Sequence, residues 1–271
     1  MWVLALLLGL AAGLLVNVLS DNLPPDDHAP PGAHRPALRA PHCRACGLAR
    51  PAEHWLALFH WRGRCRFCAA ARPARAALTE AGLALGFVYL WFWAGGDPGR
   101  FLAAAVVTTI FALITVIDLE HRLILWRTVW VSAIGLALLG GLSPERGWAK
   151  TLVGGLAGYG LVFGLFLLGQ LYAVLLARLR GQPLDEIAFG GGDVNLAGLI
   201  GLAVGWSGVL FALFIGVVLA GLFSLGYLAV MLARRRYNPH TPFAYGPFLV
   251  VGGLLMYLHG QDLVAWWFRG R

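Results

Sequence analysis

Apolar runs separated by short polar or glycine-rich turns make up most of this 271-residue chain. A predominantly apolar segment of about 20 residues is long enough to cross a bilayer as a helix. The run at 194–204 is shorter than this, whereas the other runs approach or exceed it. The pattern predicts about eight transmembrane helices, at residues 2–20, 77–94, 101–119, 124–142, 149–176, 194–204, 209–233 and 243–268. The expected fold class is therefore an all-α, polytopic membrane helix bundle.

Residues 21–75 interrupt this pattern, because they are polar and rich in proline and arginine. The segment is too long for a connector and predicts a small domain of its own. The chain is thus expected to divide into a first transmembrane helix at 1–20, a loop domain at 21–75 and a transmembrane domain at 76–271. The first apolar run has neither a basic leading segment nor a small-residue cleavage site after it, so we expect it to be retained as a helix.

Composition and charge support a membrane protein with a defined orientation. Hydrophobic residues make up 59% of the chain and charged residues only 13%, against about 25% charged in ordinary globular proteins. With the N-terminus outside, sixteen of the Lys and Arg residues fall in cytoplasmic loops and five outside, as the excess of basic residues in cytoplasmic loops requires. The net charge of +8 is thereby explained by topology, and we expect no nucleic-acid partner.

The four cysteines form two Cys-x2-Cys pairs, Cys43 with Cys46 and Cys65 with Cys68, separated by eighteen residues. This spacing is typical of a structural zinc site with four thiolate ligands. A cytoplasmic position keeps thiols reduced and able to bind metal. Four thiolates leave no open coordination position, so the expected role is to staple the 21–75 domain. Two disulfides or four unligated thiols are the alternatives.

Two acidic residues stand where apolar runs end or begin, Asp118 and Asp193. The charge bias places both carboxylates at the cytoplasmic face. Gly190, Gly191 and Gly192 directly precede Asp193, and glycine lets another chain approach the backbone closely. Two simpler interpretations stay open. Asp118 is then the first solvated residue after a span, held by Arg122, and Asp193 is the N-cap of the next helix.

Two carboxylates that approach one another cannot both ionise at low cost, so one keeps a proton near neutral pH. Such a pair supplies a base and an acid. The base removes a proton from an attacking water, and the acid polarises the carbonyl and later protonates the leaving amine. Asp118 and Asp193 are therefore the candidate catalytic pair for peptide hydrolysis, with the three glycines admitting the substrate backbone.

Several stretches resemble a known family. The segment Gly190-Gly191-Gly192-Asp193 is similar to the GxGD signature of intramembrane aspartyl proteases, and its surroundings resemble type IV prepilin peptidases. The resemblance extends over Phe189–Ala197, Asp118–Ile124, Gly13–Val18 with Leu23-Pro24, Glu80 and the two cysteine pairs. Glu80 is open to two interpretations, as a polar anchor near the cytoplasmic surface or as a partner of the catalytic pair.

The resemblance implies a membrane aspartyl endopeptidase that removes the basic leader peptide from type IV prepilins or from pseudopilins of type II secretion. It implies a place in the bacterial cytoplasmic (inner) membrane, with the active site at the cytoplasmic face, and contact with membrane lipid. It also implies a second activity, N-methylation of the new N-terminus with S-adenosylmethionine. The oligomeric state and the natural substrate stay open.

Two positions depart from the family pattern. Leu125 stands where the family usually has proline, which we expect to loosen the start of the helix at 124–142. Asn195 stands where the family usually has lysine, which removes a cation near the pair. These departures leave room for an inactive family member that acts as a membrane assembly scaffold. A proton-coupled transporter is a further alternative, although the sequence shows neither helix-centre charges nor symmetric broken helices clearly.

Overall fold

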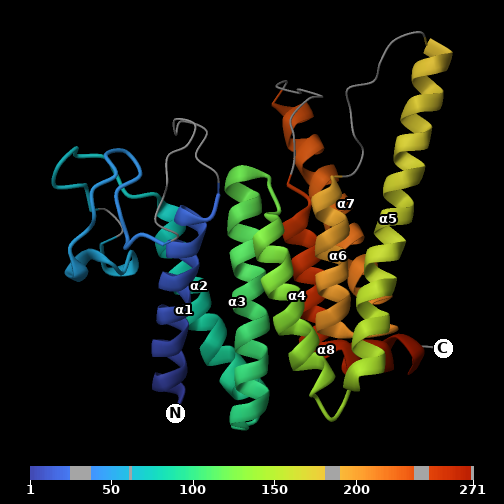
Figure 1. Ribbon diagram of the computed structural model, residues 1–271, viewed down its shortest axis with the longest axis horizontal. Coiled ribbons are helices and arrows are strands. Elements are labelled where there is room, and N and C mark those ends of the chain that lie inside the picture. The colour runs from blue at the N-terminus through green and yellow to red at the C-terminus, as the bar shows by residue number, and fades with distance from the viewer. Residues whose placement is uncertain (25–37, 61–62, 181–189, 235–243, 270–271) are drawn as a thin grey trace. The chain divides into compact units, whose positions relative to one another are not determined.

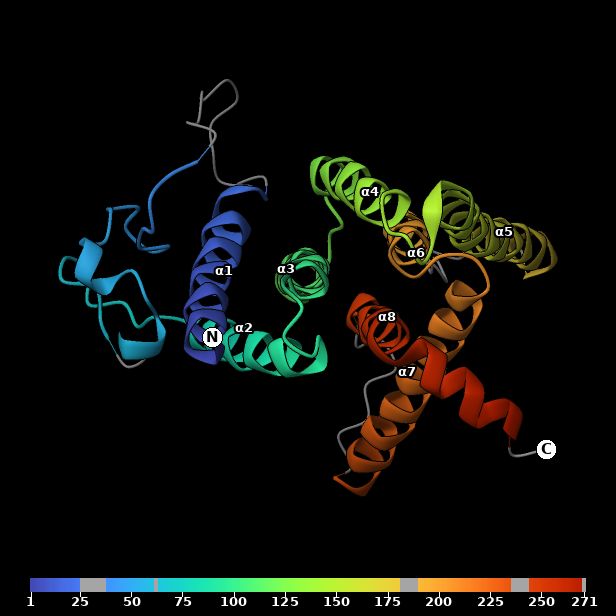
Figure 2. The ribbon, with the colours of Figure 1, turned by 90° about the horizontal axis from the view of Figure 1, so that it is seen from below.

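The structure is a computed structural model that describes residues 1–24, 38–60, 63–180, 190–234 and 244–269 (Figures 1 and 2). Within these residues the chain forms eight α-helices and two short 3₁₀ helices. Their bounds are α1 Trp2–Asn22, η1 Ala52–His54, η2 Leu58–His60, α2 Ala74–Trp93, α3 Pro98–His121, α4 Trp126–Gly141, α5 Gly147–Arg180, α6 Gly191–Val204, α7 Gly208–Ala233 and α8 Gly246–Arg269. The prediction of an all-α membrane bundle with eight helices is confirmed.

Six of the eight helices are long and apolar enough to cross a membrane, so the chain is a multi-pass membrane protein. The two others are α4, with 16 residues, and α6, with 14 residues. At 1.5 Å per residue, α6 is roughly 21 Å long, against about 30 Å for the hydrocarbon core of a bilayer. The expected short helix at 194–204 is therefore present, and it begins three residues earlier than predicted.

The chain divides into two compact units, Met1–His121 and Arg122–Arg271. The predicted three-part division at 20 and 75 stays a prediction. In the first unit, α1 lies directly on α2 because glycines remove side chains from the contact (Figure 2). A Cβ at Gly9 would come within 2.5 Å of the Leu83 carbonyl oxygen, and one at Gly13 within 2.6 Å of the Glu80 Cα.

In the second unit, α5 and α6 are in similarly close contact along a strip of small residues. A Cβ at Gly201 would lie 2.0 Å from the Gly154 carbonyl oxygen, and one at Gly158 would lie 2.3 Å from the Ala197 carbonyl oxygen. Small residues allow helix backbones to approach closely in lipid, where van der Waals contact is a main source of association. This contact fixes α6, the helix that carries Asp193, against the longest helix of the chain.

Gly201→Ala should therefore lower the melting temperature of the detergent-solubilised protein, because the new methyl group meets backbone atoms that cannot rotate away. Overpacking of this kind costs about 1–3 kcal/mol. Gly160→Ala in α5 is the matched control, since nothing lies within 4 Å of its added Cβ, and alanine favours helix. Equal melting temperatures for the two variants would contradict the close α5–α6 contact.

Candidate functional site

Asp193 lies in the first turn of α6 and is half-buried. Gly190 occupies the N-cap with an extended backbone (φ −80°, ψ 145°), and no side chain caps the helix. The Asp193 N–H donates to the Gly190 carbonyl oxygen at 3.1 Å. The interpretation of Asp193 as the N-cap is thus wrong, because the glycines themselves begin the helix. A carboxylate in the first turn is stabilised by the positive end of the helix dipole.

The three glycines before Asp193 differ in what surrounds them. A Cβ at Gly192 would lie 3.1 Å from the Cβ of Ile124, so this glycine lets α6 pack closely on the segment that leads into α4. In contrast, no atom of the described residues lies within 4 Å of a Cβ at Gly191, and among these residues Gly190 is near only Gly192 and the Asp193 carboxylate itself. Gly190 and Gly191 are also exposed. Packing therefore explains Gly192, whereas no described side chain packs against the other two glycines except that of Asp193.

Tyr245, the residue before α8, is a neighbour of Asp193 that the sequence did not reveal. Burial raises the pKa of its phenol, and the negative charge of Asp193 raises it further. Further along the same helices, a Cβ at Gly253 of α8 would lie 3.2 Å from Ile200 of α6. The two contacts show that α6 and α8 begin at the same end. The protonated phenol of Tyr245 is therefore a hydrogen-bond donor at the same end of the helices as Asp193.

Asp118 lies in the last turn of α3 with its side chain buried, at 7% exposure. The helix continues to His121, so Asp118 lies inside the last turn of the helix and not after its end. The interpretation of Asp118 as a solvated residue is wrong on this evidence. Asp118 belongs to the first unit and Asp193 to the second, and the meeting of their carboxylates stays a prediction.

A cluster of four charged side chains surrounds the end of α3, and we name it the Arg44–Glu120 cluster: Asp21, Arg44, Arg75 and Glu120. Arg44 donates from Nη1 and Nη2 to the two Glu120 carboxylate oxygens at 3.1 and 2.7 Å, and from Nη2 to Asp21 at 2.6 Å. Arg75 donates to Glu120 at 2.6 Å and also to Asp21. Burial would lower the pKa of Arg44, but Glu120 and Asp21 raise it above its usual value. The cluster joins the end of α1, the start of α2, a cysteine loop and the end of α3.

Glu80 of α2 is fully buried. Its contacts favour the interpretation as a polar anchor over that as a partner of the catalytic pair. Its Oε1 accepts from Asn17 Nδ2 of α1 at 3.1 Å, and its Oε2 accepts from the Leu58 backbone N–H at 2.9 Å. Asn17 donates as well to the Ala76 carbonyl oxygen at 2.9 Å. A buried acid with hydrogen bonds at both oxygens holds its surroundings in place. Glu80 therefore anchors η2 to the α1–α2 pair.

The four cysteines come together as predicted. Their Sγ atoms all lie within 4.8 Å of one another, with Cys43–Cys68 at 3.6 Å and Cys46–Cys65 at 3.7 Å. All four are free thiols, so the alternative of two disulfides is wrong, since a disulfide requires about 2.05 Å. Four thiolates at about 2.3 Å from one ion in a tetrahedron would lie about 3.8 Å apart. The cluster has the geometry to hold one metal ion.

The two cysteine loops share one backbone design. The Cys43 N–H donates to the Leu48 carbonyl oxygen at 2.9 Å, and the Cys65 N–H donates to the Ala70 carbonyl oxygen at 2.9 Å. The left-handed position is Gly47 in the first loop (φ 72°) and Ala69 in the second (φ 54°). Backbone N–H groups of Phe67 and Cys68 lower the pKa of Cys65 to about 6. Folding thus prepares at least one thiolate as a metal ligand.

The departures at Leu125 and Asn195 have different consequences. Leu125 is the N-cap of α4 with φ −72° and ψ 130°, which is within the range that a proline ring imposes. The helix therefore starts in the same backbone conformation that proline would fix, and the expected loosening is not seen. Asn195 is half-buried in α6, and nothing in the structure explains its replacement of lysine.

Comparison with known proteins shows which family profile and which relatives the chain resembles. Residues 105–225 match the sequence profile described as the type IV leader peptidase family. A protein of Aeromonas hydrophila named prepilin leader peptidase/N-methyltransferase is 26% identical over 287 residues, which cover 97% of this chain and 92% of that protein. A protein of the same name from Aeromonas salmonicida (strain A449) is 26% identical over 83% of this chain and 73% of its own length. A third protein of this name, from Bacillus subtilis (strain 168), is 29% identical over 166 residues, which cover 61% of this chain and 59% of that protein. No solved structure matches the chain.

Glu120→Gln should lower the melting temperature, because it leaves two guanidinium groups with only Asp21 as a charged partner. Loss of charge-assisted hydrogen bonds in a partly buried site costs about 1–3 kcal/mol. Glu145→Gln removes an exposed carboxylate for which the described residues show no ion pair, and it should leave the melting temperature unchanged. Equal melting of both variants would show that the Arg44–Glu120 cluster does not stabilise the end of α3.

Proposed function

We propose that the chain is a member of the type IV leader peptidase family and that it is a membrane aspartyl endopeptidase that removes the leader peptide from type IV prepilins or pseudopilins. The observation that carries this proposal is the position of the two aspartates inside the matched region, 105–225. Asp118 is buried at the end of α3, and Asp193 follows an open glycine backbone at the start of α6. The relatives named prepilin leader peptidase/N-methyltransferase span most of the chain.

In the proposed mechanism, Asp118 and Asp193 share one proton. The ionised carboxylate takes a proton from water while the water oxygen bonds to the carbonyl carbon of the scissile peptide. The protonated carboxyl donates a hydrogen bond to the carbonyl oxygen and then transfers its proton. When the tetrahedral intermediate collapses, the C–N bond breaks and the leaving amine takes a proton from the pair. Because the two groups titrate together, the roles belong to the pair and not to a single residue.

The residues around Asp193 favour this chemistry in two ways. The exposed backbone at Gly190 and Gly191 leaves space for an extended substrate segment beside the carboxylate. Asp193 itself lies in the first turn of α6, where the positive end of the helix dipole interacts favourably with a carboxylate.

The proposed orientation rests on the basic residues. With the N-terminus outside, the loop domain and both aspartates face the cytoplasm, where leader peptides of newly made substrates lie at the membrane surface. The excess of Lys and Arg in these loops supports this orientation. The relatives that the chain matches are bacterial proteins named prepilin leader peptidase/N-methyltransferase, and on that basis we propose that the protein lies in the bacterial inner membrane.

We assign zinc to the four-thiolate cluster of Cys43, Cys46, Cys65 and Cys68. The Sγ separations fit a tetrahedral site, and both loops direct backbone N–H groups toward sulfur. With four protein ligands, the ion has no open position for water or substrate, so its contribution is folding energy. It would hold the cysteine loops and, through Arg44 next to Cys43, the Arg44–Glu120 cluster.

The relatives' names include N-methyltransferase, and we propose methyl transfer to the new N-terminus as a second activity. The methyl donor implied is S-adenosylmethionine. The cavity beside the cysteine loops does not suit this donor, because it is lined by Arg44, Arg50 and Arg72, and cations oppose binding of a sulfonium group. Methyl transfer is therefore proposed from the names of the relatives alone.

Asp118→Asn and Asp193→Asn should each reduce leader removal by roughly 10³-fold, since one member of an acid–base pair is lost. Each variant is co-expressed with a prepilin, and intact mass spectrometry reads loss of the leader and any added methyl group. Asp262→Asn changes an exposed aspartate of α8 and should cleave at the wild-type rate. Near wild-type cleavage by both active-site variants, or no cleavage by the unaltered protein, would end the proposal.

Replacement of Cys43, Cys46, Cys65 and Cys68 by serine should abolish stoichiometric zinc, measured as metal per chain in the purified protein. The expected loss follows because hydroxyl groups do not replace thiolates as zinc ligands. His54→Ala with His60→Ala is the control, since these rings lie next to one another, 4.2 Å apart, in the same loop domain. Zinc retained by the serine variant would contradict this assignment and show that other residues bind the metal.

A further inference from the structure

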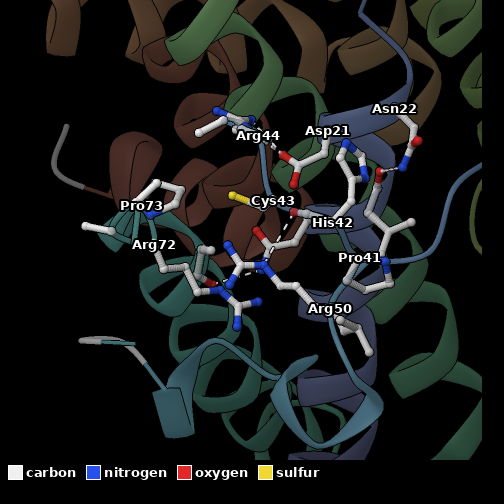
Figure 3. A pocket seen from close by; sticks show the side chains of 16 residues that line it. Asp21, Asn22, Pro41, His42, Cys43, Arg44, Arg50, Arg72 and Pro73 are labelled. Atoms are coloured by element: carbon white, nitrogen blue, oxygen red, sulfur yellow. Dashed lines mark hydrogen bonds and ion pairs between the residues drawn. The ribbon is translucent and has the colours of Figure 1, made fainter. Parts of the chain in front are cut away.

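A cavity of about 270 Å³ lies between the end of α1, the start of α2 and the first cysteine loop (Figure 3). One side is apolar and comes from Leu14 and Val18 of the α1 span. The other side is polar and includes Arg50 and Arg72. The cavity therefore combines a wall from a membrane-spanning helix with a cationic wall from the loop domain.

Arg50 and Arg72 differ from the other cations of this region in their partners. Arg44 is paired with Asp21 and Glu120. In the part of the chain that the structure describes, Arg72 donates only to carbonyl oxygens, those of His54 at 2.8 Å and Trp55 at 2.7 Å. Within the described residues, Arg50 donates through Nε to the His42 carbonyl oxygen at 3.4 Å, and neither guanidinium forms an ion pair with a carboxylate.

Two like charges thus lie side by side in a half-buried place. Figure 3 shows the guanidinium groups of Arg50 and Arg72 next to one another at the cavity. Burial lowers the pKa of Arg72, and the positive charge of Arg50 lowers it further. An anion between the two groups would remove this repulsion and use N–H donors that the protein leaves available.

The position of the cavity along α1 indicates which kind of anion it could bind. Asp21 and Asn22, which also line it, are the last residues of the apolar span, so the cavity lies at the level where the span meets water. Phospholipid phosphate groups lie at this level, and basic pockets next to transmembrane helices bind anionic headgroups. Acyl chains could then cover Leu14 and Val18.

We propose that this cavity binds a phosphate group of an anionic phospholipid, with Arg50 and Arg72 as its cationic ligands. Arg presents several N–H donors in a plane, which suits a tetrahedral phosphate better than a point charge does. Asp21 does not oppose the ligand strongly, because Arg44 and Arg75 already neutralise it. The bound lipid would fasten the loop domain to the membrane surface beside α1.

The test uses the purified full-length zinc-loaded protein and native mass spectrometry, with phosphatidylglycerol and phosphatidylcholine supplied in equal amounts. We expect the wild-type protein to retain one phosphatidylglycerol per chain in preference to phosphatidylcholine. Arg50→Gln should weaken this retention about tenfold, which corresponds to loss of one charge-assisted interaction. Arg50→Lys keeps the charge and should recover part of it. Arg50 is the better choice because Arg72 also holds two backbone carbonyls.

Arg127→Gln is the matched control, because Arg127 is an exposed arginine at the first turn of α4, outside the cavity. It should leave retention unchanged. Inorganic phosphate is added as a competitor: displacement of the lipid would assign the phosphate site to a soluble ligand, and failure to displace it would assign the site to lipid. Metal content and melting temperature verify that the Arg50 variants are folded.

Equal phosphatidylglycerol retention by the wild-type protein and a folded Arg50→Gln variant would overturn the proposal. It would also be overturned if the wild-type protein prefers neither phospholipid and its melting temperature does not rise with phosphatidylglycerol or inorganic phosphate. These readouts measure binding and not cleavage, so the outcome is independent of the proposed peptidase activity.

Discussion

Electrostatic repulsion between two neighbouring carboxylates is the constraint on which the proposed chemistry depends. If Asp118 and Asp193 lie near one another in a poorly solvated place, as proposed, they cannot both carry charge, and the proton that one of them keeps would be the catalytic acid. Such a pair works only if each carboxylate is held by a rigid support, because proton transfer requires hydrogen-bond distances. Several contacts in the structure hold the helix ends that carry Asp118 and Asp193.

Each aspartate is supported in a different way. α6 is held against α5 by the direct contact of Gly154 with Gly201, and its start is packed on Ile124 through Gly192. The end of α3 is held by the Arg44–Glu120 cluster, in which Glu120 follows Asp118 by two residues. The same cluster reaches the cysteine loops through Arg44. A metal ion bound by the four cysteines would thereby affect the proposed reaction without touching the substrate, since it would fix a loop that fixes a helix end.

The helices could be predicted from the sequence because long apolar runs give a strong signal, and the eight expected helices are all present. The cysteine cluster was also predictable, because its signal is a spacing within two short loops. The start of α6 was missed by three residues, since the glycines that begin it give no helix signal of their own. As a consequence, Asp193 lies inside the helix and not at its cap.

Other features depend on contacts between distant parts of the chain and left no local pattern. Tyr245 is adjacent to Asp193 only because α6 and α8 begin at the same end. Arg44 and Glu120 are separated by 76 residues, and either alone looks like an ordinary charge at a membrane surface. Leu125 shows the reverse case: a residue that departs from the family pattern keeps the backbone conformation that the pattern requires.

Cross-linking of the two aspartate positions tests the central claim most directly. Asp118→Cys with Asp193→Cys is oxidised in native membranes, and peptide mapping by mass spectrometry identifies the linked residues. Leu119→Cys with Asp193→Cys is the control, because Leu119 is 59% exposed and points away from Asp118 around the helix. A carboxylate pair predicts an efficient link between positions 118 and 193 and a much weaker one from 119. No link from 118, or a better one from 119, would contradict the pair.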